Sequence, residues 1–476
     1  MHRITRLLLT GMLCLLAACG DQLPFHPPLP FPTPGQHDLI VLVQPGPLTY
    51  SGEDPNNPTG LERDLIESFA LELGVGVKYQ TVSPGELPER LRKRDYHLAI
   101  GWLSPDEQPD IVATPPIYQS RDRLMQHEAS LPLTEPEQLA GKTIHTLAGS
   151  RQAANLKRLA EQFKDLNIVE VGDGDIMALL KSLAEHKVNY VAVDGMLEDI
   201  AVQFYPSLRA TLPLSSEHPV VWLMGQRPNV ELAERVRSFV ERIQRDGSLA
   251  RLEDRYLGHV RRLTQADVET FLGQIESTLP KLRKWFEMAE TITGLDWRLI
   301  AAVAYHESHW DPNATSYTNV RGIMMLTEET ADRLGVTNRL NPKESILAGA
   351  RYINLLKDML PESVSEPDRT WLALAAYNIG PGNFNAARNL AKLMKADPDT
   401  WYEMKQILPL MAKPKYYEKV KSSGARGGEA VVLVENIHSY YDILLRNQNA
   451  LRPLSPRIEG MIGMSGHTPG LKLKSH

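Results

Sequence analysis

A single carboxylate lies on an apolar stretch of the sequence AVAYHESHWDPNATS (302–316). Residues three, four and seven positions before Glu307 are Ala304, Val303 and Ile300, which is the spacing of one face of an α-helix. No Lys or Arg stands within one turn of Glu307 to balance its charge. Burial disfavours the ionised form of a carboxyl group, so its pKa is expected to rise. A carboxyl that keeps its proton near neutral pH can act as a general acid.

Two other interpretations of Glu307 are compatible with the residue pattern. The carboxylate could pair with an arginine from a distant part of the chain, which the sequence does not reveal. It could also belong to a metal site, because HESH (306–309) is superficially similar to the zinc motif H-E-x-x-H. That motif needs histidines four residues apart on one helix face, whereas His306 and His309 are three apart. The sequence therefore predicts no metal ligand and no cofactor.

Length and composition indicate a multidomain globular protein. At 476 residues the chain is too long for one typical core, so two or three domains are expected. Charged residues make up 23% and hydrophobic residues 42%, which is usual for soluble globular proteins. The formal net charge of −6 gives no reason to expect nucleic acid as a partner.

The N-terminus has the plan of a secretory signal peptide. Arg3 and Arg6 precede an apolar run at 7–18 that is too short to span a bilayer. The two cysteines of the chain, Cys14 and Cys19, both lie here, which excludes a disulfide scaffold for everything downstream. A mature chain with no other cysteine is compatible with an oxidising periplasm.

A lipid anchor is predicted at Cys19. LAAC (16–19) resembles the lipobox of bacterial lipoproteins, which implies that 1–18 is a signal peptide and that Cys19 is lipidated. A plain cleaved signal with an incidental cysteine is the alternative. Because Gly20 follows the cysteine in place of Asp, the resemblance favours the periplasmic face of the outer membrane. Prolines then dominate the sequence up to Gly35, so 19–37 is predicted to be a lipidated, semi-rigid linker.

Strand-like and helix-like patterns alternate from 38 to 262. DLIVLV (38–43) and NYVAVDG (189–195) are typical of buried strands, and GLERDLIESFALELG (60–74) is typical of a helix that ends at a glycine. Such alternation predicts a two-lobed α/β domain with largely parallel sheets, the second lobe starting near Gly141.

This segment resembles family 3 of the extracellular solute-binding proteins, the periplasmic receptors for amino acids. The resemblance implies that Asp194, in NYVAVDG, is an acidic ligand residue of the second lobe. Arg151, which opens a predicted helix after LAGS, could face the same cleft; local capping or pairing is the alternative for both. These receptors usually have an Arg after an "LS" turn, but here Ser104 is followed by PDEQP. We therefore predict a non-catalytic domain for muropeptides or another small ligand, with weak binding of free amino acids.

From 263 to 450 the pattern changes to successive amphipathic helices, which predicts a mainly α domain. In NPKESILAGARYINLLKDML (341–360), Asn341 is predicted to be the N-cap, with Glu344 closing a capping box. The segment 451–476 is rich in Pro, Gly, Ser and Lys and is predicted to be a disordered tail.

Four pieces of this α domain occur in the order found in lytic transglycosylases of the soluble-transglycosylase type. They are ES (307–308), GIMM (322–325), AYN (376–378) and RGGEAVVLVENIHSYYDIL (426–444). The resemblance implies a lysozyme-like fold. Because a receptor-like domain precedes this α domain, the resemblance is most specific to the membrane-bound lytic murein transglycosylases of the F type.

The resemblance also implies the roles of individual residues. Glu307 would be the only catalytic acid and base, supported by Ser308. Met325 stands where most branches have a Gln, although the F type also has Met. From the residues alone, both methionines of GIMM could equally be core. The substrate-binding positions implied by the motifs are Ser308, Gly322, Met324, Met325, Tyr377, Asn378 and Glu429.

The implied reaction needs one carboxyl group, whereas ordinary glycosidases use two. The acid would protonate the glycosidic oxygen between N-acetylmuramic acid and N-acetylglucosamine. The C6 hydroxyl of the N-acetylmuramic acid would then close a 1,6-anhydro ring. The sequence therefore predicts a lytic transglycosylase that acts on the glycan strands of peptidoglycan. The alternative is a periplasmic receptor that binds peptidoglycan without catalysis.

Overall fold

The computed structural model describes residues 29–51, 58–93, 95–105, 111–172, 175–225, 228–316 and 319–451. The predicted signal peptide, Cys19, the first part of the linker and the tail from 452 on lie outside the described residues. Within the described part of the chain, no helix is both long and apolar enough to cross a membrane.

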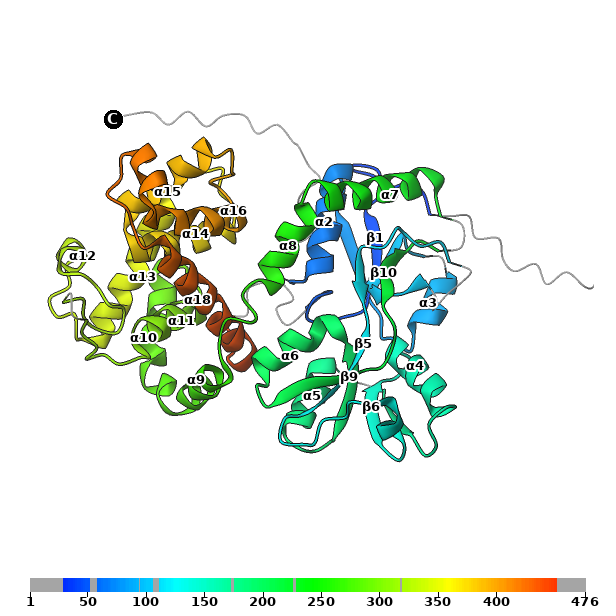
Figure 1. The fold of residues 1–476 in the computed structure, drawn as a ribbon. Coiled ribbons are helices and arrows are strands. Elements are labelled where there is room, and N and C mark those ends of the chain that lie inside the picture. Colours follow the sequence, from blue (N-terminus) through cyan, green and yellow to red (C-terminus); the bar gives the residue numbers. More distant parts are fainter. Residues whose placement is uncertain are drawn as a thin grey trace, which may run out of the picture.

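The first lobe is built on a five-stranded sheet with the order β2-β1-β3-β10-β4. Strand β1 carries the apolar run LIVLV, which is almost wholly buried because helices cover the sheet (Figure 1). β1 pairs in parallel with β2 and β3, while β10 runs antiparallel to β3 and β4. The elements are β1 (Leu39–Val43), β2 (Val77–Thr81), β3 (Leu98–Leu103), β4 (Tyr118–Ser120), β10 (His218–Leu223), α2 (Leu61–Leu73), α3 (Leu87–Lys93), α7 (Val230–Arg245) and α8 (Ser248–Leu257).

The second lobe has a five-stranded sheet of its own, with the order β7-β6-β8-β5-β9. Its elements are β5 (Asp122–His127), β6 (Thr143–Leu147), β7 (Asn167–Val171), β8 (Tyr190–Asp194), β9 (Leu208–Pro213), α4 (Arg151–Ala160), α5 (Ile176–Ala184) and α6 (Glu198–Phe204). Contrary to the predicted start near Gly141, the lobe begins at β5. β5 pairs antiparallel with both β8 and β9, so the sheet is mixed. The partners of β5 lie far along the chain, and a local pattern cannot indicate them.

Two short connections join the lobes. β4 leads into β5 through Arg121, and β9 returns to β10 through residues 214–217. β4 and β10 belong to the first sheet and β5 and β9 to the second. Any side chains that meet at these crossings can influence the angle between the lobes.

All named elements between 265 and 447 are helical, which confirms the predicted mainly α second domain. Helix α11 lies at its centre, and the side chains from Leu299 to Tyr305 are buried. The helices are α9 (Gln265–Ser277), α10 (Leu279–Thr293), α11 (Trp297–Ser308), α12 (Glu328–Arg333), α13 (Pro342–Asp358), α14 (Asp368–Ile379), α15 (Pro381–Leu393), α16 (Trp401–Ile407), α17 (Pro414–Tyr417) and α18 (Gly427–Asn447).

Helix α13 has the predicted N-cap but not the predicted capping box. The Asn341 side chain accepts a hydrogen bond from the Glu344 backbone N–H. The Glu344 carboxylate instead accepts from the backbone N–H groups of Thr337 and Asn338, at 2.9 and 3.0 Å. It therefore anchors the loop before the helix rather than the cap residue itself.

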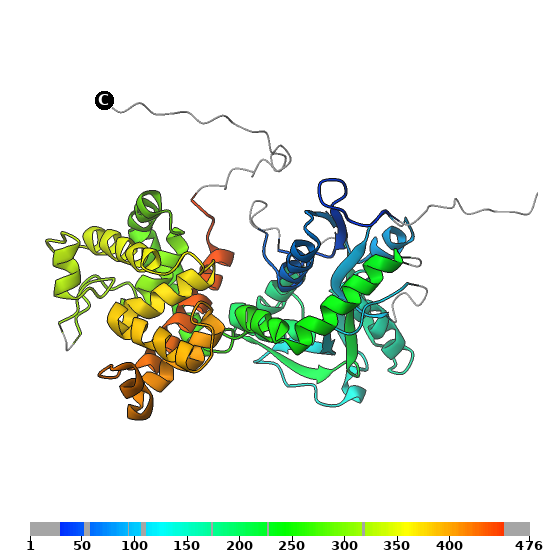
Figure 2. The ribbon, with the colours of Figure 1, turned by 90° about the horizontal axis from the view of Figure 1, so that it is seen from above.

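The two domains touch along α6 and α8 of the first and along α9, α14, α16 and α18 of the second (Figures 1 and 2). Asp254 on α8 forms an ion pair with Lys405 on α16 at 2.5 Å. Its neighbour Arg255 forms one with Asp368, at the start of α14, at 3.1 Å. These contacts are polar, as is common where domains of one chain meet.

Candidate functional site

Glu307 lies in the last turn of α11, a helix whose position is fixed by its burial. The Asp296 side chain caps the start of the helix by accepting from the Arg298 backbone N–H at 2.8 Å. At the other end, His309 and Trp310 have φ angles of 51° and 62°, in the left-handed region, so the chain turns away sharply after Ser308. The carboxyl group is thus held at the end of a rigid element.

The surroundings of Glu307 favour its protonated form. Burial raises its pKa to about 8. The C-terminal end of a helix also carries partial negative charge, which acts in the same direction. Among the described residues, no hydrogen bond or ion pair engages the carboxylate, so the interpretation as an arginine-paired glutamate finds no support. The side chain is partly exposed and can be reached from solvent.

Ser308 connects α11 to the loop 322–325. Its Oγ donates to the backbone carbonyls of Ala304, at 3.0 Å, and Ile323, at 2.9 Å. The hydroxyl is therefore occupied by the protein itself. Its role in this structure is to hold the loop beside Glu307.

Gly322 lets this loop pass close to another backbone segment. Its φ is +81°, and a Cβ built on it would lie 1.8 Å from the Arg339 carbonyl oxygen. Any side chain at this position would push the loop away from α11. Gly322 therefore shapes the loop, and no side chain is available there to bind a sugar.

The two methionines of the loop have different surroundings. Met324 is completely buried, and its side chain packs so closely on Gly349 that a Cβ there would lie 2.6 Å from the Met324 Cε. The core alternative therefore describes the Met324 side chain in this structure, and its contact with substrate stays a prediction. Met325 is partly exposed and has a φ of 45°, so it remains the candidate for a sugar contact.

Tyr377, on α14, also contacts the loop 322–325. Its hydroxyl donates to the Met324 backbone carbonyl at 2.6 Å. Burial raises the pKa of Tyr377, and the charge of Glu307 acts in the same direction. Asn378 follows at the exposed end of α14. Tyr377, Ser308, the loop and Glu307 thus form one unit.

Glu429 stands apart from this unit in the contacts of the described residues. It is exposed in the first turn of α18 and pairs with Arg426 at 3.1 Å. No hydrogen bond or ion pair of the described part of the chain connects it to α11 or to the loop. A role in substrate binding stays a prediction for Glu429.

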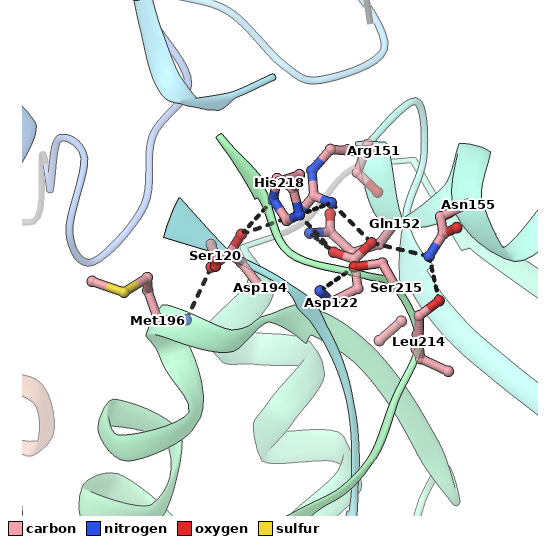
Figure 3. A network of polar contacts seen from close by, with 12 residues as sticks. Ser120, Asp122, Arg151, Gln152, Asn155, Asp194, Met196, Leu214, Ser215 and His218 are labelled. Atoms are coloured by element: carbon pink, nitrogen blue, oxygen red, sulfur yellow. Dashed lines mark hydrogen bonds and ion pairs between the residues drawn. The ribbon is translucent and has the colours of Figure 1, made fainter. Parts of the chain in front are cut away.

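Arg151 and Asp194 meet in the first domain, where they pair with each other (Figure 3). The Arg151 guanidinium donates two hydrogen bonds to Asp122, at 2.7 and 3.0 Å, and one to Asp194 at 3.1 Å. Asp194 also caps the turn after β8 by accepting from the Met196 backbone N–H. The local-pairing alternative thus describes both residues in this structure.

The same network joins the two lobes. Ser120 donates to Asp194 at 2.5 Å, and His218 lies 3.2 Å from Arg151. Ser120 and His218 belong to the first sheet, whereas Asp122 and Asp194 belong to the second. Sequence reasoning missed Ser120, Asp122 and His218, because no local motif marks them and only the crossing of the strands brings them together.

Comparisons with known proteins agree with both halves of this architecture. Residues 39–259 match the model of the bacterial extracellular solute-binding proteins, family 3, and residues 284–399 match the transglycosylase SLT domain. The membrane-bound lytic murein transglycosylase F of Methylobacillus flagellatus is 40% identical, over 95% of this chain and 97% of that protein. The protein of the same name from Nitrosospira multiformis is 42% identical, over 93% of each. This chain belongs to the membrane-bound lytic murein transglycosylase F family.

Among solved structures, a mutant arginine-binding protein from T. maritima aligns with a TM-score of 0.42 and 16% identity, over 46% of this chain and 95% of that one. The similarity of the F-family relatives, in contrast, spans both domains. The pairing of a receptor-like domain with an SLT domain in one chain is therefore a property of the family. The predicted family and the predicted two-part fold are both confirmed.

A glycine substitution tests whether the loop must pass close to Arg339. We expect Gly322→Ala to lower the free energy of unfolding by about 3 kcal/mol or more, because its Cβ would overlap a backbone oxygen. Gly335→Ala is the matched control: φ there is also positive, at +70°, but nothing lies within 4 Å of the added Cβ. The control should lose only about 1–2 kcal/mol. Equal losses in urea unfolding of the two variants would contradict the close approach.

Proposed function

We propose that Glu307 is the sole acid and base of a lytic transglycosylase that cleaves the β-1,4 bond between N-acetylmuramic acid and N-acetylglucosamine. Membership of the F family supports a lyase acting on peptidoglycan. The observation that carries the assignment is the unpaired carboxyl group at the end of α11, with its pKa raised to about 8 by burial.

One carboxyl group can complete this reaction because the substrate supplies the nucleophile. In the first step, protonated Glu307 donates its proton to the glycosidic oxygen, and the N-acetyl oxygen of the muramic acid stabilises the positive charge at C1. In the second, the Glu307 carboxylate takes the proton of the C6 hydroxyl as that oxygen bonds to C1. The product ends in a 1,6-anhydro ring, no water is consumed, and Glu307 recovers its proton.

The unit around Glu307 supports this mechanism. Ser308 and Tyr377 hold the backbone of the loop 322–325 with hydrogen bonds to two successive carbonyls, those of Ile323 and Met324. A loop fixed on both sides can position a sugar hydroxyl next to the carboxyl group, which is where much of the rate enhancement must arise. We propose that Met325 and Asn378, which are partly or fully exposed, line the glycan-binding cleft with this loop.

The first domain is proposed to bind muropeptides and to modulate activity. A pocket of about 260 Å³ lies beside the two connections that join the lobes. Its lining includes Arg121, Arg123, Glu198 and Glu217. These charges form the pairs Arg121–Glu217 and Arg123–Glu198, for which the carboxylate and ammonium groups of a peptide stem would compete. We assign 38–262 to this domain and 263–450 to the catalytic domain.

We further propose that a lipid on Cys19 holds the protein at the periplasmic face of the outer membrane.

Replacing the acid tests the catalytic assignment. We expect Glu307→Gln to lower the release of anhydro-muropeptides from purified murein by about 10³-fold or more, because the amide cannot donate a proton. Mass analysis of the products checks this result: anhydro ends weigh one water less than hydrated ends. Glu276→Gln, an exposed acid on α9, is the control and should keep full activity. Hydrated ends would indicate a muramidase, and absence of product from the wild type would indicate a receptor without catalysis.

The pH dependence tests the protonation state. Only protonated Glu307 can start the reaction, so we expect kcat/KM to be high below the pKa of about 8 and to fall as the pH rises through it. His306 cannot cause this fall, because burial and then the charge of His309 lower its pKa to about 4. The fall should be absent from the residual rate of Glu307→Gln. A profile that loses activity near the ordinary glutamate value of 4.5 would contradict the proposal.

The ligand of the first domain is tested by calorimetry with a purified muropeptide. We expect Arg121→Ala to weaken binding about tenfold or more, because a charge-assisted hydrogen bond is lost. Arg245→Ala, an exposed arginine on α7, is the control and should bind as the wild type does. Unchanged affinity in Arg121→Ala, or stronger binding of free amino acids than of the muropeptide, would contradict this part of the proposal.

A further inference from the structure

Two histidines and an aspartate meet where the two domains touch. His259 follows α8, at the end of the first domain, and His438 and Asp442 lie one turn apart on one face of α18. The imidazole nitrogens and the carboxylate oxygen that these residues offer all lie within 4.8 Å of one another. His438 and Asp442 lie within the motif piece 426–444, but neither they nor His259 was assigned a role there, and the proposed reaction uses none of the three.

The cluster is held in place by the contact between the domains. His259 is only 2% exposed, and its Nε2 lies 2.6 Å from the Asp442 Oδ2. The Ser439 Oγ, on the same helix, donates to the His259 backbone carbonyl at 2.9 Å. His438 Nε2 lies 3.9 Å from the other carboxylate oxygen of Asp442. The donor atoms therefore come from both domains.

The polar groups of this cluster are incompletely satisfied within the described residues. The Nδ1 of His259 is buried and has no hydrogen-bond partner there. The two imidazole rings stack with centroids 3.5 Å apart and an angle of 17° between their planes. An anionic carboxylate with two imidazoles is one of the donor sets that bind Zn²⁺ in proteins.

We propose that His259, His438 and Asp442 form a binding site for one divalent transition-metal ion, with Zn²⁺ the best match, that links the receptor-like and catalytic domains. Three protein ligands leave a fourth tetrahedral position for water. Lone pairs of imidazole lie in the ring plane, so one ring must turn out of the stack when the ion binds. Because the ligands come from both domains, the ion strengthens their contact beside the pairs Asp254–Lys405 and Arg255–Asp368.

A metal titration of the untagged full-length protein in detergent tests the site. After treatment with EDTA, we expect calorimetry to show one Zn²⁺ bound per chain, and Co²⁺ to produce the strong visible absorption of a four-coordinate site. His438→Ala and Asp442→Asn should each weaken Zn²⁺ binding more than about tenfold. His127→Ala is the matched control, since His127 and His186 also lie close, with ring centroids 3.9 Å apart, far along the chain from this cluster. The control should bind Zn²⁺ as the wild type does.

The proposal is overturned if the wild type binds no Zn²⁺ and gives no Co²⁺ absorption, or if both variants bind as tightly as the wild type. It is equally overturned if His127→Ala removes the binding. Circular dichroism establishes that the variants are folded. Should one of the two variants fail to fold, the Zn²⁺ affinity of the other decides.

Discussion

The proposed chemistry of this protein depends on one unfavourable arrangement, a largely buried carboxyl group with no compensating cation among the described residues. The arrangement is possible because α11 runs through the centre of its domain and is surrounded by α10, α13 and α18. The burial of its apolar side chains fixes the position of the helix, and that position determines the environment of Glu307 at its end. Burial then favours the protonated form of the group, which is the form that the proposed reaction requires.

The hydrogen bonds of the site act mainly on backbone atoms. Ser308 and Tyr377 both donate to carbonyls of the loop 322–325, and Gly322 lets that loop approach another backbone segment. Rigid backbone is a suitable wall for a sugar polymer, since it does not lose rotamer freedom when the ligand binds. The motif residues thus fix the backbone around Glu307 more than they offer side chains to a ligand.

In the receptor-like domain, the charged residues that resemble ligand-binding positions are engaged with each other. Arg151 neutralises Asp122 and Asp194 at the crossing between the two sheets, with only 11% of its side chain exposed. The buried carboxylates would be costly without this partner. A ligand that binds Asp194 would have to displace the Arg151 guanidinium, so its binding free energy would be reduced by the cost of breaking that ion pair.

The sequence by itself determined the elements and the family. The 3.6-residue period around Glu307 was enough to predict a buried helix that ends in an acid, and the order of four short motifs was enough to identify the transglycosylase domain. These features are local, so the chain records them directly. The strand and helix alternation of the first domain was equally local, although the position of β5 in the second sheet was not.

Only the tertiary structure decided which side chains face one another. In the folded protein, Met324 packs on Gly349, and the Ser308 hydroxyl donates to a carbonyl of the loop 322–325. The Glu344 carboxylate accepts a hydrogen bond from Thr337 and not from the predicted N-cap residue. The tertiary structure also brought His259 to Asp442 across 183 positions of the chain. Such contacts depend on how whole elements pack, and packing is set by the sum of many distant side chains, for which no short stretch of sequence carries a signal.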